Sequence, residues 1–288
     1  MDVVRFDNAS EYYQRVESYL LEDEATHCLL LGISKALSKS DRDDANLPYL
    51  ATVENKGLIK TTAIQTPPRK LMLAKSTDNK AVDSIAKDIA SPNKSLPGVI
   101  APKSEAIIFA RTWQSLTGQA FELAVAMKIH QLEIVQPITS ASGNLRLATQ
   151  SDRNLLIKWG KAFEDEALGD NEPRSDHQLW FNRHLKQKSL FVWQDKVSVS
   201  MAAFGGATPN GIRINAVYTP PEYRGKGYAT SCVAGVSQQL LNQDYKYCFL
   251  FTNLANPISN HIYRQIGYQP VWVIYDYDFK SRERSPRR

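Results

Sequence analysis

The residues with the clearest chemical potential form a turn late in the chain, between a predicted strand and a predicted helix. Two prolines lead into Arg224-Gly225-Lys226-Gly227, and a helical pattern follows directly. Glycine lets the backbone approach a ligand closely, and Arg224 and Lys226 add mobile positive charge. The first amides of a helix have no intrahelical partner, and the helix dipole is positive there. The turn therefore predicts an anion site, suited to phosphate.

Two other phosphate-binding motifs do not fit this turn. A P-loop needs a glycine, four residues and then Gly-Lys-Ser/Thr, whereas Gly227 follows Lys226. A dinucleotide fingerprint needs a small residue in place of Thr230, and it belongs in the first strand–helix unit of a fold. Taken alone, the turn is also compatible with an ordinary glycine-rich loop.

A second stretch with suitable chemistry follows the predicted strand Tyr247–Thr252. Asn256-Pro257 has the residue types of a helix start, and the helix stops at Gly267. Tyr263 lies beside a stripe of isoleucines that are four residues apart and predict the buried side of this helix. Its position is compatible with a core tyrosine whose hydroxyl is satisfied, or with a hydroxyl that reaches a cleft.

Together the two stretches resemble the GNAT superfamily of N-acetyltransferases. Arg224 to Ala229 match its Gln/Arg-x-x-Gly-x-Gly/Ala signature. Asn256, Tyr263 and Gly267-Tyr268 match its next strand and helix at the expected separation. The resemblance covers about residues 145–279. It implies an acyltransferase that uses acetyl-CoA as co-substrate and acetylates a primary amine of a small-molecule or peptide acceptor by direct attack.

The resemblance also implies roles for single residues. In such folds two neighbouring strands part, and the pantetheine arm of CoA lies in the gap, bonded to the end of the first strand. The pyrophosphate then meets the amides of the glycine loop, and Tyr263 is the general acid that protonates the departing thiolate. The residues that this assigns to CoA binding are Val217, Tyr218, Thr219, Arg224, Gly225, Lys226, Gly227, Tyr228, Ala229, Thr230 and Asn256.

The reaction also needs a proton acceptor, which the sequence does not single out. An alkyl amine with a pKa near ~10.4 is protonated at neutral pH. Glu164, Asp165, Glu166 and His177 lie near the helices that border the acceptor cleft of this fold, but three consecutive acids are also typical of a solvated helix end. No cluster of His and Cys has metal-ligand spacing, so no metal is expected.

The elements that position these residues predict a layered α/β fold. The second half reads as a strand, two helices, three strands, a helix, a strand, a helix and a strand. The resemblance makes this a mixed, mostly antiparallel sheet flanked by helices. The predicted strands are at 145–148, 190–194, 197–204, 212–218, 247–252 and 271–279, and the helices are capped by Ser151-Asp152, at 176–185, at 227–241 and from Asn256 to Gly267.

The first half shows a similar coarse order without the phosphate turn. Asn8–Leu37 predicts one helix, three short strands follow up to Leu73, and Phe121–Gln136 predicts a strand pair. Two further helices are predicted between them, at 79–89 and 104–116. The Leu96-Pro-Gly98-Val turn has no arginine nearby. The stretch from Glu24 to Ile33 and the three short strands resemble the degenerate N-terminal half of two-domain GNAT proteins. An unrelated α/β domain is the alternative.

Length and charge limit the number of domains and the kind of partner that the chain is expected to have. The 288 residues predict two domains, and the small polar stretch Pro137–Asn144 predicts their boundary. We therefore expect tandem GNAT-like domains: a degenerate one at 1–140 and a catalytic one at 141–279. The net charge of +5 lies mostly in the basic tail 280–288, which we expect to be disordered. The nearly neutral body argues against nucleic-acid binding.

Cellular location and partners follow from what the sequence lacks. It shows no targeting segment and no apolar run long enough to cross a membrane. Cys28, Cys232 and Cys248 are widely spaced, which is typical of buried thiols in the cytoplasm. A homodimer is one oligomeric state left open. The alternative function is a CoA-binding or protein-interaction module without catalysis.

Overall fold

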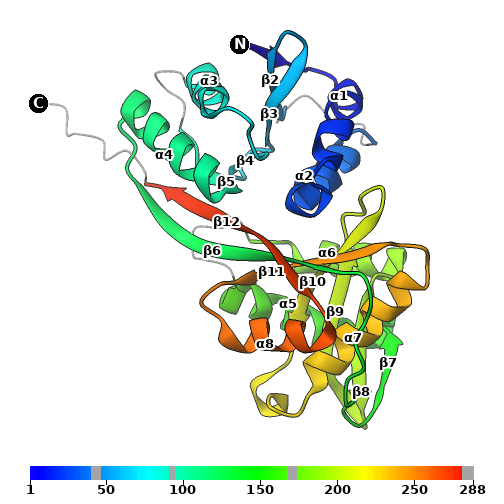
Figure 1. Cartoon of the computed structure of the whole chain (residues 1–288). Coiled ribbons are helices and arrows are strands. Elements are labelled where there is room, and N and C mark those ends of the chain that lie inside the picture. Colours follow the sequence, from blue (N-terminus) through cyan, green and yellow to red (C-terminus); the bar gives the residue numbers. More distant parts are fainter. Residues whose placement is uncertain (40–46, 91–94, 168–173, 281–288) are drawn as a thin grey trace, which may run out of the picture. The chain divides into compact units, whose positions relative to one another are not determined.

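The computed structural model describes residues 1–39, 47–90, 95–167 and 174–280 (Figure 1). These residues group into two compact units. The N-terminal unit holds residues 1–128 and the described chain from Trp272 on, and the C-terminal unit holds Ile129–Val271. Within the described chain, no helix is long and apolar enough to span a bilayer. Apart from Lys280, the predicted basic tail lies outside the described residues.

The C-terminal unit is a mixed sheet with helices on both faces. Its strands follow the order β6-β11-β10-β9-β8-β7, in which β10 and β11 are parallel and β7 to β10 pair antiparallel. Its elements are β7 (Asn144–Leu147), α5 (Arg153–Ala167), α6 (His177–Gln187), β8 (Leu190–Asp195), β9 (Val197–Gly205), β10 (Gly211–Tyr218), α7 (Tyr228–Leu241), β11 (Tyr247–Asn253) and α8 (Pro257–Ile266). Two long strands, β6 (Phe121–Leu132) and β12 (Gln269–Phe279), have residues in both units.

Alternating strand residues build one core on each face of this sheet. Phe191 and Trp193 of β8 pack with residues of α7 and α8. Leu190 and Val192 pack with residues of α5 and α6. Successive side chains of a strand point to opposite faces, so a strand covered on both faces is a continuous apolar run. That run is why β8 could be recognised in the sequence.

The N-terminal unit repeats this order of elements. Its strands follow the order β1-β2-β3-β4-β5-β12, in which β4 and β5 are parallel and the other described pairs antiparallel. Helices α1 and α2 share one core with the sheet, and α3 and α4 share the other. Its elements are β1 (Asp2–Arg5), α1 (Ala9–Leu21), α2 (Glu24–Leu37), β2 (Tyr49–Asn55), β3 (Leu58–Gln65), β4 (Leu71–Leu73), α3 (Asn79–Ile89), β5 (Gly98–Pro102) and α4 (Lys103–Thr117).

The last strand of the chain therefore completes the sheet of the N-terminal unit. Residues 274–278 of β12 pair antiparallel with β5. Lys70 is buried and lies 2.6 Å from carboxylate oxygens of both Asp276 and Asp278. A Cβ on Gly98 would come to 2.1 Å from the Tyr277 carbonyl oxygen, so only glycine fits where β12 passes.

Several boundaries differ from the sequence-based expectations. Asn8–Leu37 forms two helices, because Asp23 caps a new helix by accepting from the Thr26 amide at 3.4 Å. β6 is one strand that ends at Leu132. The helix expected after Ser151-Asp152 is introduced by a capping box of Thr149 with Asp152. The compact units divide within β6 and β12, and the domain boundary near residue 140 stays a prediction.

Candidate active site

The candidate site begins where β10 and β11 part. Their parallel ladder covers only 211–213 against 247–249. The remaining residues of each strand, up to Tyr218 and Asn253, show no pairing with each other in the described chain. A parallel pair that separates leaves backbone groups open to an extended ligand. The gap expected beside the glycine turn is therefore present.

A β-bulge lies on β10 beside this gap. Asn215 pairs with Ala203 and Tyr218 with Met201, so β10 has one residue more than β9 between these pairs. Ala216 has a φ of 48°, which residues other than glycine rarely adopt. A bulge turns backbone groups out of the ladder and often lies next to an active site. Alanine shows no preference for positive φ, so this feature could not be predicted from the sequence.

The glycine loop follows β10 and leads into α7. Gly225 and Gly227 have φ values of 74° and 77°. Around the place of a Cβ on Gly225 the described residues leave open space, and at Gly227 the nearest atom is Ala141 Cβ at 3.8 Å. Gly227 is the N-cap of α7, and no side chain caps that helix in the described structure. An uncapped helix start after two glycines of positive φ is a feature of anion sites, and the binding of an anion here stays a prediction.

The two basic side chains of the loop are held by neighbours. Arg224 Nη2 donates to both carboxylate oxygens of Glu166, at 2.8 and 3.0 Å, and Nε donates to the Thr219 carbonyl at 2.9 Å. Lys226 Nζ donates to the Glu222 carbonyl at 3.3 Å. Arg224 thus pairs with an exposed carboxylate at the junction of β10 and α5, and the expected contact of both basic side chains with a phosphate stays a prediction.

Tyr228 ties the start of α7 to the sheet. Its side chain is 9% exposed, and its hydroxyl donates to Asp195 Oδ2 at 2.6 Å. Ser142 Oγ donates to the same oxygen at 2.6 Å, and the two bonds lower the pKa of the Asp195 carboxyl. Trp193 Nε1 donates to the Ser142 carbonyl at 2.8 Å. Only the backbone of Tyr228 is therefore available to a ligand at the loop.

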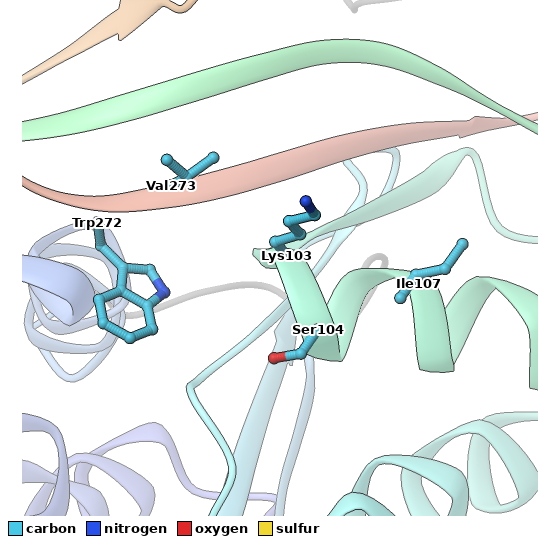
Figure 2. A pocket seen from close by; sticks show the side chains of 5 residues that line it. All are labelled: Lys103, Ser104, Ile107, Trp272 and Val273. Atoms are coloured by element: carbon cyan, nitrogen blue, oxygen red, sulfur yellow. The ribbon is translucent and has the colours of Figure 1, made fainter.

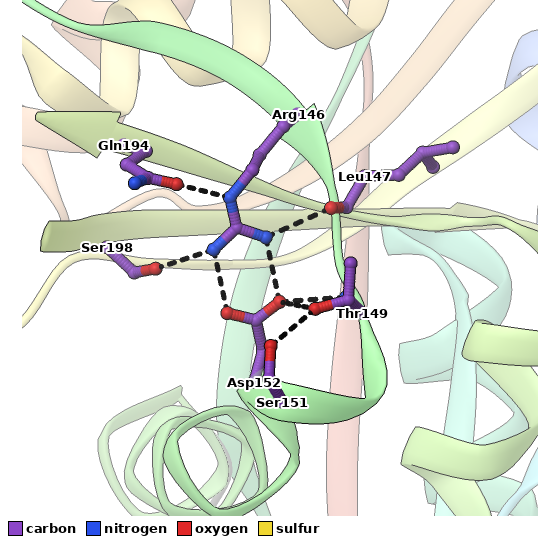
Figure 3. Close-up of polar contacts among 7 residues, drawn as sticks. All are labelled: Arg146, Leu147, Thr149, Ser151, Asp152, Gln194 and Ser198. Carbon is purple, nitrogen blue, oxygen red and sulfur yellow. Dashed lines mark hydrogen bonds and ion pairs between the residues drawn. The ribbon is translucent and has the colours of Figure 1, made fainter.

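A second polar network fixes β7 to the start of α5 (Figure 3). The Arg146 guanidinium donates to both carboxylate oxygens of Asp152 at 2.7 Å and to Ser198 Oγ at 3.2 Å. It also donates to the side-chain oxygen of Gln194. The Thr149 amide donates to Asp152 Oδ2 at 2.8 Å. Chiefly because of Arg146, the pKa of Asp152 is lowered.

The turn from β11 into α8 is organised by two asparagines. Asn256 is the N-cap of α8 and accepts from the Ser259 amide at 3.0 Å. Asn260, which the sequence-based reasoning missed, accepts from Thr252 Oγ1 at 2.7 Å and donates to the Asn256 carbonyl at 2.8 Å. The capping role of Asn256 is thus visible, and its expected contact to CoA stays a prediction.

Tyr263 belongs to α8, and its side chain lies in the core that the helix covers. It is 8% exposed and contacts the rings of His130 and Tyr268, with centroid distances of 6.4 and 5.9 Å. Burial raises the pKa of Tyr263, so the phenol stays protonated at neutral pH. Among the described residues its hydroxyl has no hydrogen-bond partner, which leaves the proton available to a bound molecule. Of the predicted isoleucine stripe, Ile262 and Ile266 pack in this core, whereas Ile258 at its start is 71% exposed.

A pocket of about 130 Å³ opens beside the bulge. His177 Nε2 lies 3.3 Å from Glu164 Oε2, and both side chains are largely buried. Of the other acids considered, Asp165 and Glu166 are exposed and pair with Arg174 and Arg224. The lining residues are Gly160, Phe163, Glu164, Ser175, His177, Trp180, Asn215 and Ala216.

In the N-terminal unit, side chains bind the backbone amides of the corresponding loop. It follows β4, which leaves its parallel partner β5 after two residue pairs. The Lys75 amide donates to His27 Nε2 at 3.1 Å, and the Ser76 amide donates to Glu105 Oε1 at 2.8 Å. Asp78 caps α3 by accepting from the Lys80 amide at 2.9 Å. A buried glutamate and a capping aspartate are unfavourable neighbours for phosphate.

A second pocket, of about 410 Å³, lies in the N-terminal unit (Figure 2). It is lined by Lys103, Ser104, Ile107, Trp272 and Val273. Lys75 Nζ lies 4.2 Å from the centre of the Trp272 ring. This pocket brings together no acid–base pair, so size alone does not locate the chemistry.

The fold and the loop define a class of protein. Residues 156–268, from α5 to the end of α8, match the acetyltransferase (GNAT) family. The C-terminal half of the chain therefore carries a GNAT domain. No curated protein matches the sequence.

Solved structures show the same fold over nearly the whole chain. A GNAT acetyltransferase from Colwellia psychrerythraea is 11% identical with a TM-score of 0.62, covering 97% of this chain and 100% of its own. A Drosophila protein is 13% identical with a TM-score of 0.68, covering 96% and 98%. A tandem GNAT protein from the clavulanic acid biosynthesis pathway is 10% identical with a TM-score of 0.53, covering 99% of each chain. The expected fold class is confirmed.

Proposed function

We propose that this protein is an acetyl-CoA-dependent N-acetyltransferase whose C-terminal unit carries out the transfer. The proposal rests above all on the parting of β10 and β11 beside the uncapped start of α7. A ligand that is extended at one end and carries a pyrophosphate fits both features. The pantetheine arm lies along Val217 to Thr219, the pyrophosphate meets the amides of Gly225 to Thr230, and Asn256 contacts CoA from the other strand.

The bulge at Ala216 supplies the chemistry at the thioester. Amides that leave the ladder can donate to the carbonyl oxygen as it becomes an oxyanion, which stabilises the tetrahedral intermediate. The amine nitrogen attacks the carbonyl carbon directly, the C–S bond breaks, and the electron pair leaves with sulfur. Tyr263 donates its proton to the thiolate. A phenol whose pKa is at or above its ordinary value is protonated at neutral pH, so Tyr263 is in the correct state to act as an acid.

Turnover with a panel of amines tests the proposal. The full chain is incubated with acetyl-CoA and polyamines, amino acids, aminoglycosides or lysine peptides, and free CoA thiol is measured. We expect at least one amine to accelerate thiol release and to appear as its N-acetyl product. Acetyl-CoA binding without turnover across the panel would favour the rival, a CoA-binding module without catalysis.

A further inference from the structure

The pocket beside the bulge contains a polar pair that the reaction outlined above does not use. Glu164 lies on α5 and His177 on α6, and their side chains are 10% and 17% exposed. Glu164 Oε2 accepts from the Ser175 amide at 3.2 Å and lies 3.3 Å from His177 Nε2. The carboxylate thus contacts both the Ser175 amide and the imidazole, and its contact with Nε2 orients the ring.

The other ring nitrogen, Nδ1, lies beside Gly160, and both residues line the pocket. A Cβ on Gly160 would come to 3.4 Å from His177 Nδ1 and to 3.3 Å from the Trp180 ring. Gly160 is an interior residue of α5, where glycine costs about 1 kcal/mol relative to alanine. Glycine at this position destabilises the helix but avoids a methyl group next to Nδ1. Among the described residues Nδ1 has no hydrogen-bond partner.

The pocket and the bulge share Asn215 and Ala216, so a molecule in the pocket lies against the backbone proposed to hold the thioester carbonyl. A nucleophile, a proton acceptor and an electrophile must meet within hydrogen-bond distances. Here a base with an orienting carboxylate lies on the wall of the same small cavity. That arrangement is the one used to activate nucleophiles in general.

We propose that this pocket binds the acceptor amine, that His177 Nδ1 takes its proton, and that Glu164 is the positioning residue. The inference rests on the proposed acetyl transfer. The acceptor enters as an ammonium ion attracted by the Glu164 carboxylate. His177 removes one proton and passes it to solvent, and the neutral amine attacks. The nitrogen loses a second proton as the amide forms; Tyr263 protonates sulfur and regains this proton through solvent, so one proton is released per turnover.

The size and walls of the pocket define the class of acceptor. Its volume of about 130 Å³ is smaller than a cavity of ~150 Å³ that holds benzene. Phe163 and Trp180 offer aromatic faces to methylene groups and to an ammonium ion. We therefore infer an unbranched alkyl chain that ends in a primary amine, such as a lysine side chain or one arm of a polyamine.

His177→Ala with added imidazole is the direct test. Turnover of n-butylamine is expected to fall about 100-fold while acetyl-CoA affinity, measured by calorimetry, stays unchanged. Free imidazole is expected to restore turnover at least about tenfold, which a purely structural role would not allow. Gln178→Ala, the next residue on α6, is the matched control. A kcat within about threefold of wild type would overturn the role.

Two further measurements keep the inference distinguishable from the proposed function. Glu164→Gln is expected to lower kcat without rescue by imidazole, because the histidine still fills its place; equal rescue would refute the positioning role. Cyclohexylamine is expected to react at least about tenfold more slowly than n-butylamine, and equal rates would refute the narrow pocket.

If wild type turns over no amine, the proposed function fails. If wild type turns over an amine and His177→Ala turns it over at the same rate, this inference fails and the proposed function stands. Should His177→Ala bind no acetyl-CoA, His177→Gln replaces it, with loss of kcat at unchanged affinity as the required result.

Discussion

At the scale of single residues, the account depends on the hydroxyl of Tyr263. Burial raises its pKa, and no described group competes for its proton. We expect Tyr263→Phe to keep the ring packing with His130 and Tyr268, because only the oxygen is removed. Acetyl-CoA affinity should stay unchanged, and kcat should fall about 100-fold or more, as steady-state kinetics would show. An unchanged kcat would remove Tyr263 from the mechanism.

Gly225 tests the phosphate loop, and Gly57 provides a matched control. Both have φ values near 75° and open space around the place of a Cβ. Alanine at either position should cost a similar amount, about 1 kcal/mol, in unfolding free energy. Only Gly225→Ala should weaken acetyl-CoA binding, by about tenfold, because its methyl group would stand where the pyrophosphate approaches. Equal affinities for both variants would place the pyrophosphate elsewhere.

The residue scale also shows where sequence reasoning ends. The glycines at 225 and 227 reveal their backbone conformation because few other residues tolerate it. Asn256 reveals a helix start for a similar reason. Ala216 reveals nothing, since its positive φ results from tertiary pairing of β10 with β9. The partnership of Glu164 with His177 was equally out of reach, because it joins two helices by their packing.

At the scale of elements, the Arg146–Asp152 pair joins β7 to α5. The pKa of Asp152 is lowered in the folded protein, so the pair contributes stability above the unfolded value of ~3.9 and loses it as pH falls through the lower folded value. Asp152→Asn should lower the unfolding free energy by about 2 kcal/mol at pH 7. The difference from wild type should shrink below about pH 4. Denaturant unfolding at pH 7 and pH 3 would show this, and a constant difference would contradict it.

Element order was more predictable than element pairing. The apolar run of β8 and the helical spacing in α7 were visible in the sequence because each follows from local geometry. The pairing of β12 with β5 was not, since its determinants, Lys70 and Gly98, lie far from β12 in sequence. The division of the compact units within β6 and β12 also depends on such distant pairing, so it has no local signal in the sequence.

At the scale of the whole molecule, two units share an order of elements but differ at one loop. Gly227 begins α7 without a side-chain cap, whereas Asp78 caps α3 and Glu105 binds the Ser76 amide. We therefore expect one acetyl-CoA per chain in calorimetry. Two equivalents would mean that the side chains in the loop after β4 move aside for a second ligand.

A crystal structure of the full chain with CoA tests the central claim most directly. The account predicts CoA in the C-terminal unit, with its pyrophosphate on the amides of Gly225 to Thr230 and its thiol beside the bulge at Ala216. Tyr263 and the pocket of Glu164 and His177 should both face the sulfur. CoA bound in the N-terminal unit, or with its thiol directed away from β10, would contradict the account.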